Sequence, residues 1–351
     1  MRYRYAYEIK PDGTVRLLRA YGRENVVILP EKIGDRYVTE TAAYMFSAHR
    51  DGEPEGALYW EGEVKMAETD DPEKRWDILE QVWRAENWTA CEEENDSPKP
   101  ICGPELSCIV FPDSVRQIGR YQFYNCEGLR TMRIPTTLCD IGGGAFNGCR
   151  KVQDLVVRVF VGKKSGLREI LTELNETLTV HYYEEDGVPH ESARLLFPEY
   201  FEEAIENTPA RQLVTEVHGC GHRYRYCFQN THFVYSEYDR LFFWVKEQES
   251  VKLGAELAID RLRFPRQLSE KTRADYRSYL KERWPEVTAF LVKRDDPAMV
   301  RYLAEDEETS AEELDLLTRA AQGEGRTGMV SDLMGIRHRR FAPKRHRIEA
   351  F

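Results

Sequence analysis

The residues best suited to chemistry lie in one short segment, HGCGHRYRYC, which contains His218, Cys220, His222 and Cys227. On a strand, the first three would project from one side, because side chains alternate between the two faces. Imidazole and thiolate are ligands that zinc prefers, so His218, Cys220 and His222 are the candidate metal ligands. Ligands two residues apart on a strand stand about 7 Å apart, however, which is too far for one tetrahedral site. The other interpretation is a glycine-rich turn that leads to a strand with a buried Cys227.

Other catalytic arrangements find little support in the sequence. Cys220 could be a nucleophile activated by His218 or His222, but nothing supplies an orienting third residue or an oxyanion hole. Three consecutive glycines at 142–144 lack the lysine and the strand–loop–helix context of a phosphate-binding loop. We therefore expect no enzymatic activity and no cofactor. A metal-binding protein or hydrolase-like enzyme centred on His218, Cys220 and His222 is the alternative.

Composition and charge indicate a folded protein. The chain has 351 residues, of which 41% are hydrophobic, and a net charge of −11. Residues 52–100 hold fifteen Asp and Glu but only five Lys and Arg, so most of the net charge belongs to this segment. So acidic a chain argues against nucleic-acid binding by the protein as a whole. The basic stretch 337–347 leaves contact with RNA, membrane or an acidic partner open at that end. Without a membrane-spanning run or an export signal, and with eight cysteines, we expect a cytoplasmic location and no membrane contact.

A 23-residue repeat organises the middle of the chain. Five residues of the segment 106–128 recur 23 positions later in the segment 129–151: Pro112 as Pro135, Ile118 as Ile141, Gly119 as Gly142, Phe123 as Phe146 and Cys126 as Cys149. A third unit begins at Val152, and a looser early copy spans 26–46. One unit cannot bury its apolar face alone but stacked units can, so the period indicates a solenoid.

Each unit has a strand before its proline, and the alternation of residues predicts which side chains face the interior. We expect these to point inward: Ile109, Phe111, Met132, Ile134, Leu155 and Val157. We expect these to point outward: Cys108, Val110, Thr131, Arg133, Asp154 and Val156. The phenylalanines should fill the coil, the cysteines should be small buried residues, and Gly119 and Gly142 should permit a turn with positive φ.

These units resemble the BspA-type leucine-rich repeat, whose consensus is close to IxIPxxVxxIGxxAFxxCxxL. FPDSVRQIGRYQFYNCEGL and IPTTLCDIGGGAFNGCRKV follow it closely, with departures at Gln122 and Leu138. The resemblance implies a protein–protein interaction or scaffold module that binds a protein partner through its repeat face. The candidate contact residues on that face are Val110, Arg133, Asp154 and Val156. With a YDxLF segment at 238–242 and an ankyrin-like end, the chain is similar to leucine-rich repeat proteins of anaerobic bacteria, which implies a bacterial source.

The segments around the repeats have separate predictions. Residues 1–24 are predicted to form a capping hairpin with an Asp-Gly turn, and 25–165 carry the repeats. An acidic, tryptophan-rich insert interrupts them at 47–105. Within it, Trp76 and Trp83 share one face of a predicted helix. They either contact a partner or dock on the solenoid.

The C-terminal half is predicted to be mixed and then helical. In the connector 166–235, LREILTEL and PEYFEEAIEN look like helices, whereas TLTVHYY and RQLVTEVHGCGHRYRYCF look like strands. Residues 236–342 predict an α-helical, ankyrin-like domain with a capping box at Ser310 and Glu313, followed by a basic tail at 343–351. The predicted fold class is α+β, a short leucine-rich-repeat β-solenoid followed by an α-helical domain.

Overall fold

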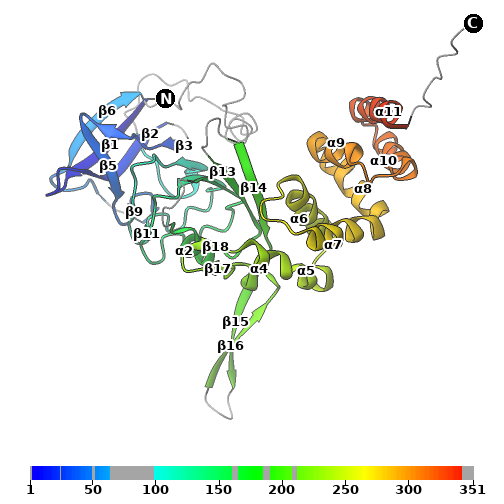
Figure 1. Ribbon diagram of the computed structural model, residues 1–351. Coiled ribbons are helices and arrows are strands. Elements are labelled where there is room, and N and C mark those ends of the chain that lie inside the picture. Colours follow the sequence, from blue (N-terminus) through cyan, green and yellow to red (C-terminus); the bar gives the residue numbers. More distant parts are fainter. Residues whose placement is uncertain are drawn as a thin grey trace, which may run out of the picture. The chain divides into compact units, whose positions relative to one another are not determined.

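The structure is a computed structural model that describes residues 2–23, 25–49, 52–63, 99–159, 165–184, 190–207 and 212–341. The chain divides into two compact units, Met1–Leu241 and Phe242–Phe351. The predicted fold class is confirmed, because unit 1 contains a β-solenoid and unit 2 is α-helical (Figure 1).

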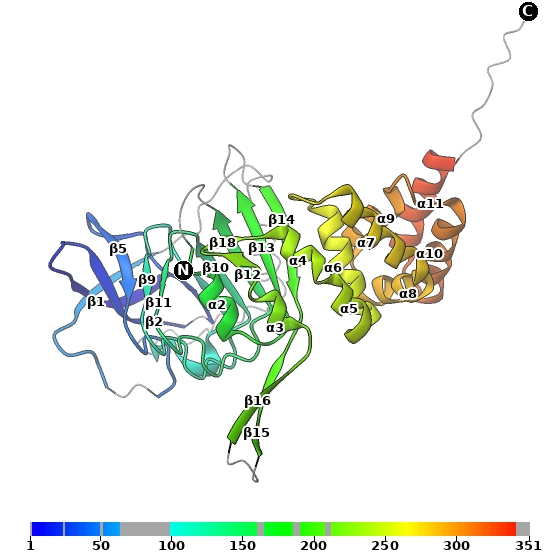
Figure 2. The same cartoon turned by 60° about the horizontal axis from the view of Figure 1, so that its bottom comes forward.

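The main sheet of unit 1 takes one strand from each coil of the solenoid. Its strands are β3 (Val26–Ile28), β8 (Cys108–Val110), β10 (Thr131–Pro135), β12 (Asp154–Val159), β13 (Leu178–Glu184) and β14 (His190–Phe197). They lie in the order β14-β13-β12-β10-β8-β3. The five strands from β3 to β13 are parallel, and β14 is added antiparallel (Figure 2). This arrangement brings equivalent positions of successive repeats side by side.

A second sheet contains the N-terminal hairpin and the short strands on the other side of the coils. It comprises β1 (Arg2–Ile9), β2 (Val15–Gly22), β4 (Lys32–Ile33), β5 (Arg36–Thr41), β6 (Leu58–Glu63), β7 (Lys99–Pro100), β9 (Gln117–Ile118) and β11 (Asp140–Ile141). The hairpin expected in 1–24 is present as β1 and β2. The described ends of the insert 47–105 add β6 and β7 to this sheet, followed by a short 3₁₀ helix at Gly103–Glu105. Trp76 and Trp83 lie outside the described residues.

Stacked phenylalanines form the interior of the solenoid. The ring centroids of Phe46 and Phe123 are 5.5 Å apart, and those of Phe123 and Phe146 are 5.4 Å apart. The repeat cysteines Cys126 and Cys149 are buried as expected, and each thiol donates to the carbonyl of a phenylalanine one coil earlier. Cys126 Sγ lies 3.2 Å from Phe46 O, and Cys149 Sγ lies 3.1 Å from Phe123 O. The residues predicted to point inward are all buried: Ile109, Phe111, Met132, Ile134, Leu155 and Val157.

The repeat glycines are needed for close packing rather than for positive φ, so that part of the prediction is wrong. A Cβ on Gly119 would lie 2.2 Å from Ala43 N, and a Cβ on Gly142 would lie 2.2 Å from Arg120 N. Adjacent coils therefore approach each other too closely at this position for any side chain. Positive φ occurs instead two residues before each phenylalanine, at Tyr44, Tyr121 and Gly144.

Both ends of the coil stack are closed by hydrogen bonds. At the first coil, the hydroxyls of Tyr3 and Tyr5 each donate at 2.7 Å to β3, to the carbonyls of Val26 and Ile28. At the last BspA-like coil, Glu173 accepts from Gly144 N at 2.9 Å and Phe146 N at 3.0 Å. Glu173 ends α2 (Leu167–Glu173), the helix predicted from LREILTEL. Inside the stack, such backbone N–H and C=O groups bond to the neighbouring coil. At the two ends there is no neighbouring coil, and these side chains supply the missing hydrogen-bond partners.

The remainder of unit 1 differs from prediction in two places. It contains β15 (Phe201–Asn207), β16 (Gln212–His218), α3 (Gly221–Tyr224), β17 (Phe228–Gln229), β18 (His232–Phe233) and α4 (Tyr235–Arg240). The strand predicted from TLTVHYY is β13. The helix predicted from PEYFEEAIEN is wrong, because residues 201–207 of this segment form β15 and pair with β16. The strand predicted through HRYRYCF is also wrong, since the chain there turns through α3.

Unit 2 consists of a series of α-helices. They are α5 (Phe242–Gln248), α6 (Val251–Arg263), α7 (Glu270–Glu282), α8 (Trp284–Arg294), α9 (Pro297–Glu305), α10 (Ala311–Gly323) and α11 (Thr327–Phe341). Helices α6, α8 and α10 follow one another in one row, and α9 packs on α11. The capping box at Ser310 and Glu313 is present. Among the helices of the described ranges, none is both long and apolar enough to cross a membrane.

A weak internal repeat underlies this packing. Asp295 and Gly325, 30 positions apart, both adopt left-handed φ at a helix end. Three apolar residues recur at the same offset on α9 and α11: Met299 as Met329, Val300 as Val330 and Leu303 as Leu333. The offset is close to the period of ankyrin-type repeats and agrees with the helix–turn–helix rhythm seen in the sequence.

Candidate functional site

The outward face of the main sheet brings the four predicted contact residues together. Arg133 on β10 is in register with Val110 on β8 and with Val156 on β12. Asp154 precedes Val156 by two residues and therefore shares its face. The stacking of the repeats explains why these residues lie on one face. Their role in partner binding stays a prediction.

The two valines are not exposed, and this corrects the expected surface. Val110 is 6% exposed and Val156 is fully buried. Longer neighbours cover them. Arg133 Nη1 donates to Phe111 O at 3.2 Å, which draws its side chain toward β8, and Val156 lies in register between Arg133 and His181. Alternation correctly predicts the direction of each side chain but not the size of its neighbours.

Charged side chains form the accessible part of this face. Asp113 follows β8 and accepts a hydrogen bond from Arg158 on β12. Its other carboxylate oxygen lies 3.8 Å from Arg133 Nη2, so one aspartate is shared by two arginines. The side chains of Asp113, Arg133 and Arg158 are partly buried. Solvent therefore screens the attraction between their charges less than it would on an open surface.

A buried histidine connects the last three strands of the sheet. His181 on β13 has Nε2 2.9 Å from Asp154 Oδ1 and Nδ1 2.8 Å from Glu191 Oε1. Burial lowers the pKa of His181, but the hydrogen bonds to Asp154 and Glu191 outweigh it, and the pKa lies above its usual value. Both ring nitrogens then carry protons and donate to carboxylates.

Glu191 on β14 is held in its charged form. Burial by itself would raise its pKa, but hydrogen bonds from Arg194 and His181 lower the pKa of Glu191 to about 2. Arg194 Nε and Nη2 donate to the two carboxylate oxygens at 2.7 and 2.6 Å. We define the charged sheet face by its seven ionisable residues: Asp113, Arg133, Asp154, Arg158, His181, Glu191 and Arg194.

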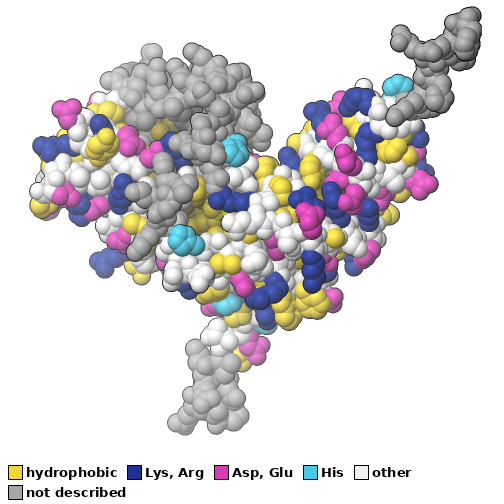
Figure 3. All heavy atoms as spheres, in the orientation of Figure 1, with side chains coloured by type: hydrophobic (Ala, Val, Ile, Leu, Met, Phe, Trp, Pro, Cys, Tyr) yellow, Lys and Arg dark blue, Asp and Glu magenta, His cyan; other side chains and the backbone are white. Residues whose placement is uncertain are grey.

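Five of these residues are not predicted as contact residues from the sequence: Asp113, Arg158, His181, Glu191 and Arg194. The sequence does contain a signal for His181, because TLTVHYY alternates in polarity and follows the repeat strands, as another strand of the same sheet would. It could not show that His181 lies between a carboxylate on each neighbouring strand, because that depends on register. On the side of unit 2 that Figure 3 shows, acidic, basic and apolar side chains are interspersed rather than gathered by sign.

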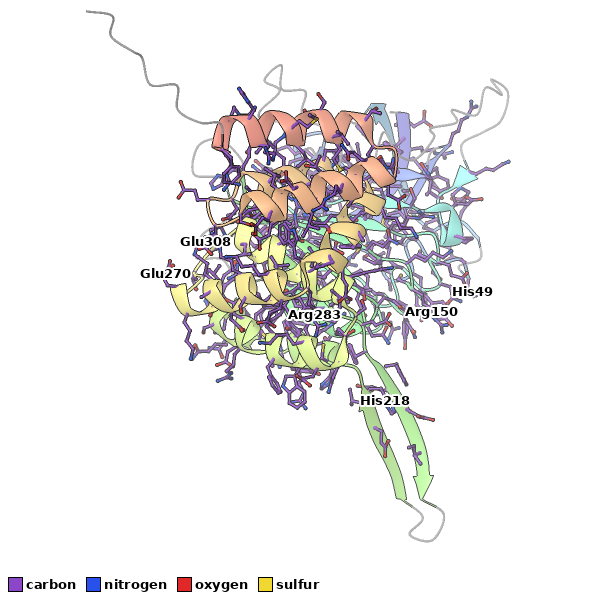
Figure 4. All side chains as sticks on the ribbon, turned by 90° about the vertical axis from the view of Figure 1, so that its right-hand side faces the viewer. His49, Arg150, His218, Glu270, Arg283 and Glu308 are labelled. Carbon is purple, nitrogen blue, oxygen red and sulfur yellow. The ribbon has the colours of Figure 1, made fainter. Side chains whose placement is uncertain are left out.

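The candidate metal ligands are not arranged as a site. His218 is the last residue of β16, Gly219 has a φ of +85° that ends the strand, and His222 lies in α3. The His218 ring stacks on Phe201 at 4.6 Å, at the base of the β15–β16 hairpin (Figure 4). Cys220 is buried. Within the part of the chain that the structure describes, no cluster of three or more His, Cys, Asp or Glu could hold a metal ion, so the metal alternative is unsupported.

The other interpretation of this segment included a buried Cys227, and that is confirmed. Cys227 is 3% exposed, and burial raises the pKa of its thiol to about 12. A thiol with so high a pKa stays protonated at neutral pH and is a poor nucleophile.

Comparison with known proteins agrees with the coil geometry. Residues 102–163 match a family model described as "BspA type Leucine rich repeat region (6 copies)". These residues form a BspA-type leucine-rich repeat region. The match covers β8, β10 and β12, where the stacked phenylalanines and the thiol–carbonyl bonds recur. No match was found among curated proteins.

Two solved structures are similar to the chain at low identity. One is a leucine rich cell surface protein from Faecalibacterium prausnitzii A2-165, at 14% identity and a TM-score of 0.24. The alignment covers 46% of this chain and 36% of that one, so the chain spans about a third of that protein's length. The other is the T. pallidum leucine rich repeat protein, at 20% identity and a TM-score of 0.21, covering 50% of this chain and 78% of that one.

Proposed function

We propose that the BspA-type region is a protein-binding module without catalytic activity, and that the charged sheet face contacts the partner. The observation that carries the proposal is the register of the main sheet. Parallel pairing aligns the outward positions of successive coils in rows. The charged side chains of Arg133, Asp154 and Arg158 stand partly exposed on this face, beside the buried Val110 and Val156. A rigid row of this kind suits recognition of a surface on another protein.

The bonding of His181 supports a binding role over an enzymatic one. A general base needs a free ring nitrogen within reach of substrate. Both nitrogens of His181 are engaged by carboxylates, Asp154 and Glu191, so this imidazole holds its protons in place rather than transferring them. The capped ends of the coil stack further support a preformed, rigid surface.

Photocrosslinking in cells that naturally express the protein tests the proposal. A benzophenone amino acid replaces Asp113 on the face, and in a matched variant it replaces Glu127, an exposed carboxylate in a turn of the same array. We expect a discrete protein adduct from position 113 and none from position 127. Equal labelling at both positions, or none at position 113, would contradict the assigned surface.

A further inference from the structure

The β15–β16 hairpin is a separate arm of unit 1. Its two strands pair in continuous antiparallel register from Phe201 opposite His218 to Asn207 opposite Gln212. Among the described strands, neither pairs with any other, so each keeps an outer edge (Figures 1 and 2). A two-stranded hairpin is marginally stable by itself, and an open edge is a template for another strand.

The base of the arm is built to hold it firmly. A Cβ on Gly221 would lie 2.0 Å from Pro198 O, so the chain segments that enter and leave the hairpin are in close contact. The buried guanidinium of Arg225 donates to both of these segments, to Pro198 O and to Gly221 O. The arm is therefore anchored rigidly while its strands extend into solvent.

The arm exposes an unusual set of side chains. Phe201 is 58% and Val217 is 44% exposed. Glu202 and Glu203 on β15 are exposed as well, and Glu203 stands directly opposite Glu216 on β16. Like charges directly opposite each other destabilise a strand pair. Within the arm, His218 stacks on Phe201 and lies 3.3 Å from Glu203, but Phe201, Glu202 and Glu203 stay exposed. A bound basic strand would cover the apolar groups and neutralise the carboxylates.

We propose that the outer edge of β15 binds an extended basic segment of another protein by strand addition. Backbone hydrogen bonds supply the pairing, lysine or arginine lies opposite Glu202 and Glu203, and apolar residues lie opposite Phe201 and Ile205. A second copy of this arm does not fit, because β15 edges would bring glutamates against glutamates. Nucleic acid and anionic lipid are repelled by the same carboxylates.

A synthetic strand tests the proposal on the full chain. The probe is a fluorescein-labelled peptide, TVTKKVT, with both ends otherwise blocked, and the control peptide carries glutamate in place of both lysines. We expect the probe to bind with a salt-sensitive affinity and to slow hydrogen exchange at residues 201–207. Absence of binding at millimolar probe, equal binding of the control peptide, or binding without protection of 201–207 overturns the proposal.

Variants identify the carboxylates involved. Glu202→Lys with Glu203→Lys should weaken probe binding about tenfold or more, and the uncharged pair Glu202→Gln with Glu203→Gln should weaken it less. Glu127→Lys, the matched change in a solenoid turn, should leave it unchanged. Equal affinity of the wild type and both double variants overturns the proposal. The arm does not include residues of the charged sheet face. Photocrosslinking at Asp113 tests the proposed function, and peptide binding tests the arm, so either proposal can fail while the other stands.

Discussion

At the scale of single residues, His181 decides how the last strands of the solenoid are held. It donates to Asp154 on β12 and to Glu191 on β14 from a position on β13 between them. Such a buried arrangement is favourable only while the imidazole is charged, because a neutral ring leaves one carboxylate facing a nitrogen lone pair. The protonation state of one side chain therefore couples three strands.

This coupling predicts a limited pH range of maximal stability. The folded pKa of His181 lies above 6.5, so its contribution to the free energy of unfolding is present below about pH 6.5 and is lost as the pH rises through the folded pKa. The pKa of Glu191 falls from 4.5 to about 2, so its contribution is present above about pH 4.5 and is lost toward pH 2. Urea unfolding between pH 3 and 9 measures the decline in the free energy of unfolding on both the acid and the alkaline side. His181→Gln should remove the decline on the alkaline side, and parallel curves for variant and wild type above pH 6.5 would contradict this role.

Arg225 gives a second prediction at this scale. Its guanidinium is fully buried and donates to four backbone carbonyls, those of Leu174, Glu176, Pro198 and Gly221. Burial lowers the pKa of Arg225 to about 10, which still leaves it charged at neutral pH. Lysine has a single nitrogen and cannot reach all four acceptors. Arg225→Lys should lower the free energy of unfolding by about 3 kcal/mol in urea, whereas the exposed Arg223→Lys should change it by less than about 0.5 kcal/mol.

At the scale of elements, the coils are held by backbone contact that tolerates no side chain at one repeat position. Gly142 and Gly143 are adjacent, yet a Cβ at Gly142 would lie 2.2 Å from Arg120 N, and a Cβ at Gly143 would meet nothing within 4 Å. Gly142→Ala should therefore cost about 3 kcal/mol or more of unfolding free energy. Gly143→Ala should be neutral or slightly stabilising. Chemical denaturation of the two variants compares them directly, and equal stabilities would refute the close-approach explanation.

The elements that sequence predicts well are those whose pattern is local or repeated. The 23-residue period predicts the strands β8, β10 and β12 and the stacked Phe123 and Phe146. β15 was mistaken for a helix because FEEAIEN lacks clear alternation, and its partner β16 decides its conformation.

The charged sheet face was predicted only in part for a related reason. Alternation correctly predicts that Arg133 and Asp154 share a face. The bonds of His181, however, join residues 10 and 27 positions apart. Such bonds depend on register and on chain reversals that the local sequence does not reveal. The burial of Val110 and Val156 also depends on register, because Arg133 lies beside Val110 and His181 lies beside Val156 on neighbouring strands.

At the scale of the whole molecule, the YDxLF segment separates two cores. The Tyr238 hydroxyl donates to Leu196 O at 2.6 Å, and its ring packs on Phe197 and Tyr224, all in unit 1. Phe242, four residues later, packs on Tyr276 and Tyr279 in unit 2. Tyr238 therefore packs in the core of unit 1, and Phe242 packs in the core of unit 2. The helix α4, which precedes Phe242, belongs to unit 1.

Because each unit has its own core, we expect the two to unfold separately within the full chain. Gly142→Ala should shift only the transition of unit 1, and Leu303→Ala, which removes a buried side chain of α9, should lower only that of unit 2 by about 3 kcal/mol. Hydrogen exchange measured by mass spectrometry across a urea series assigns each transition to its peptides. If either variant shifted the peptides of both units equally, the chain would unfold as one cooperative body. Separate transitions would mean that the helical unit can vary without disturbing the repeat surface, as a scaffold with two independent parts requires.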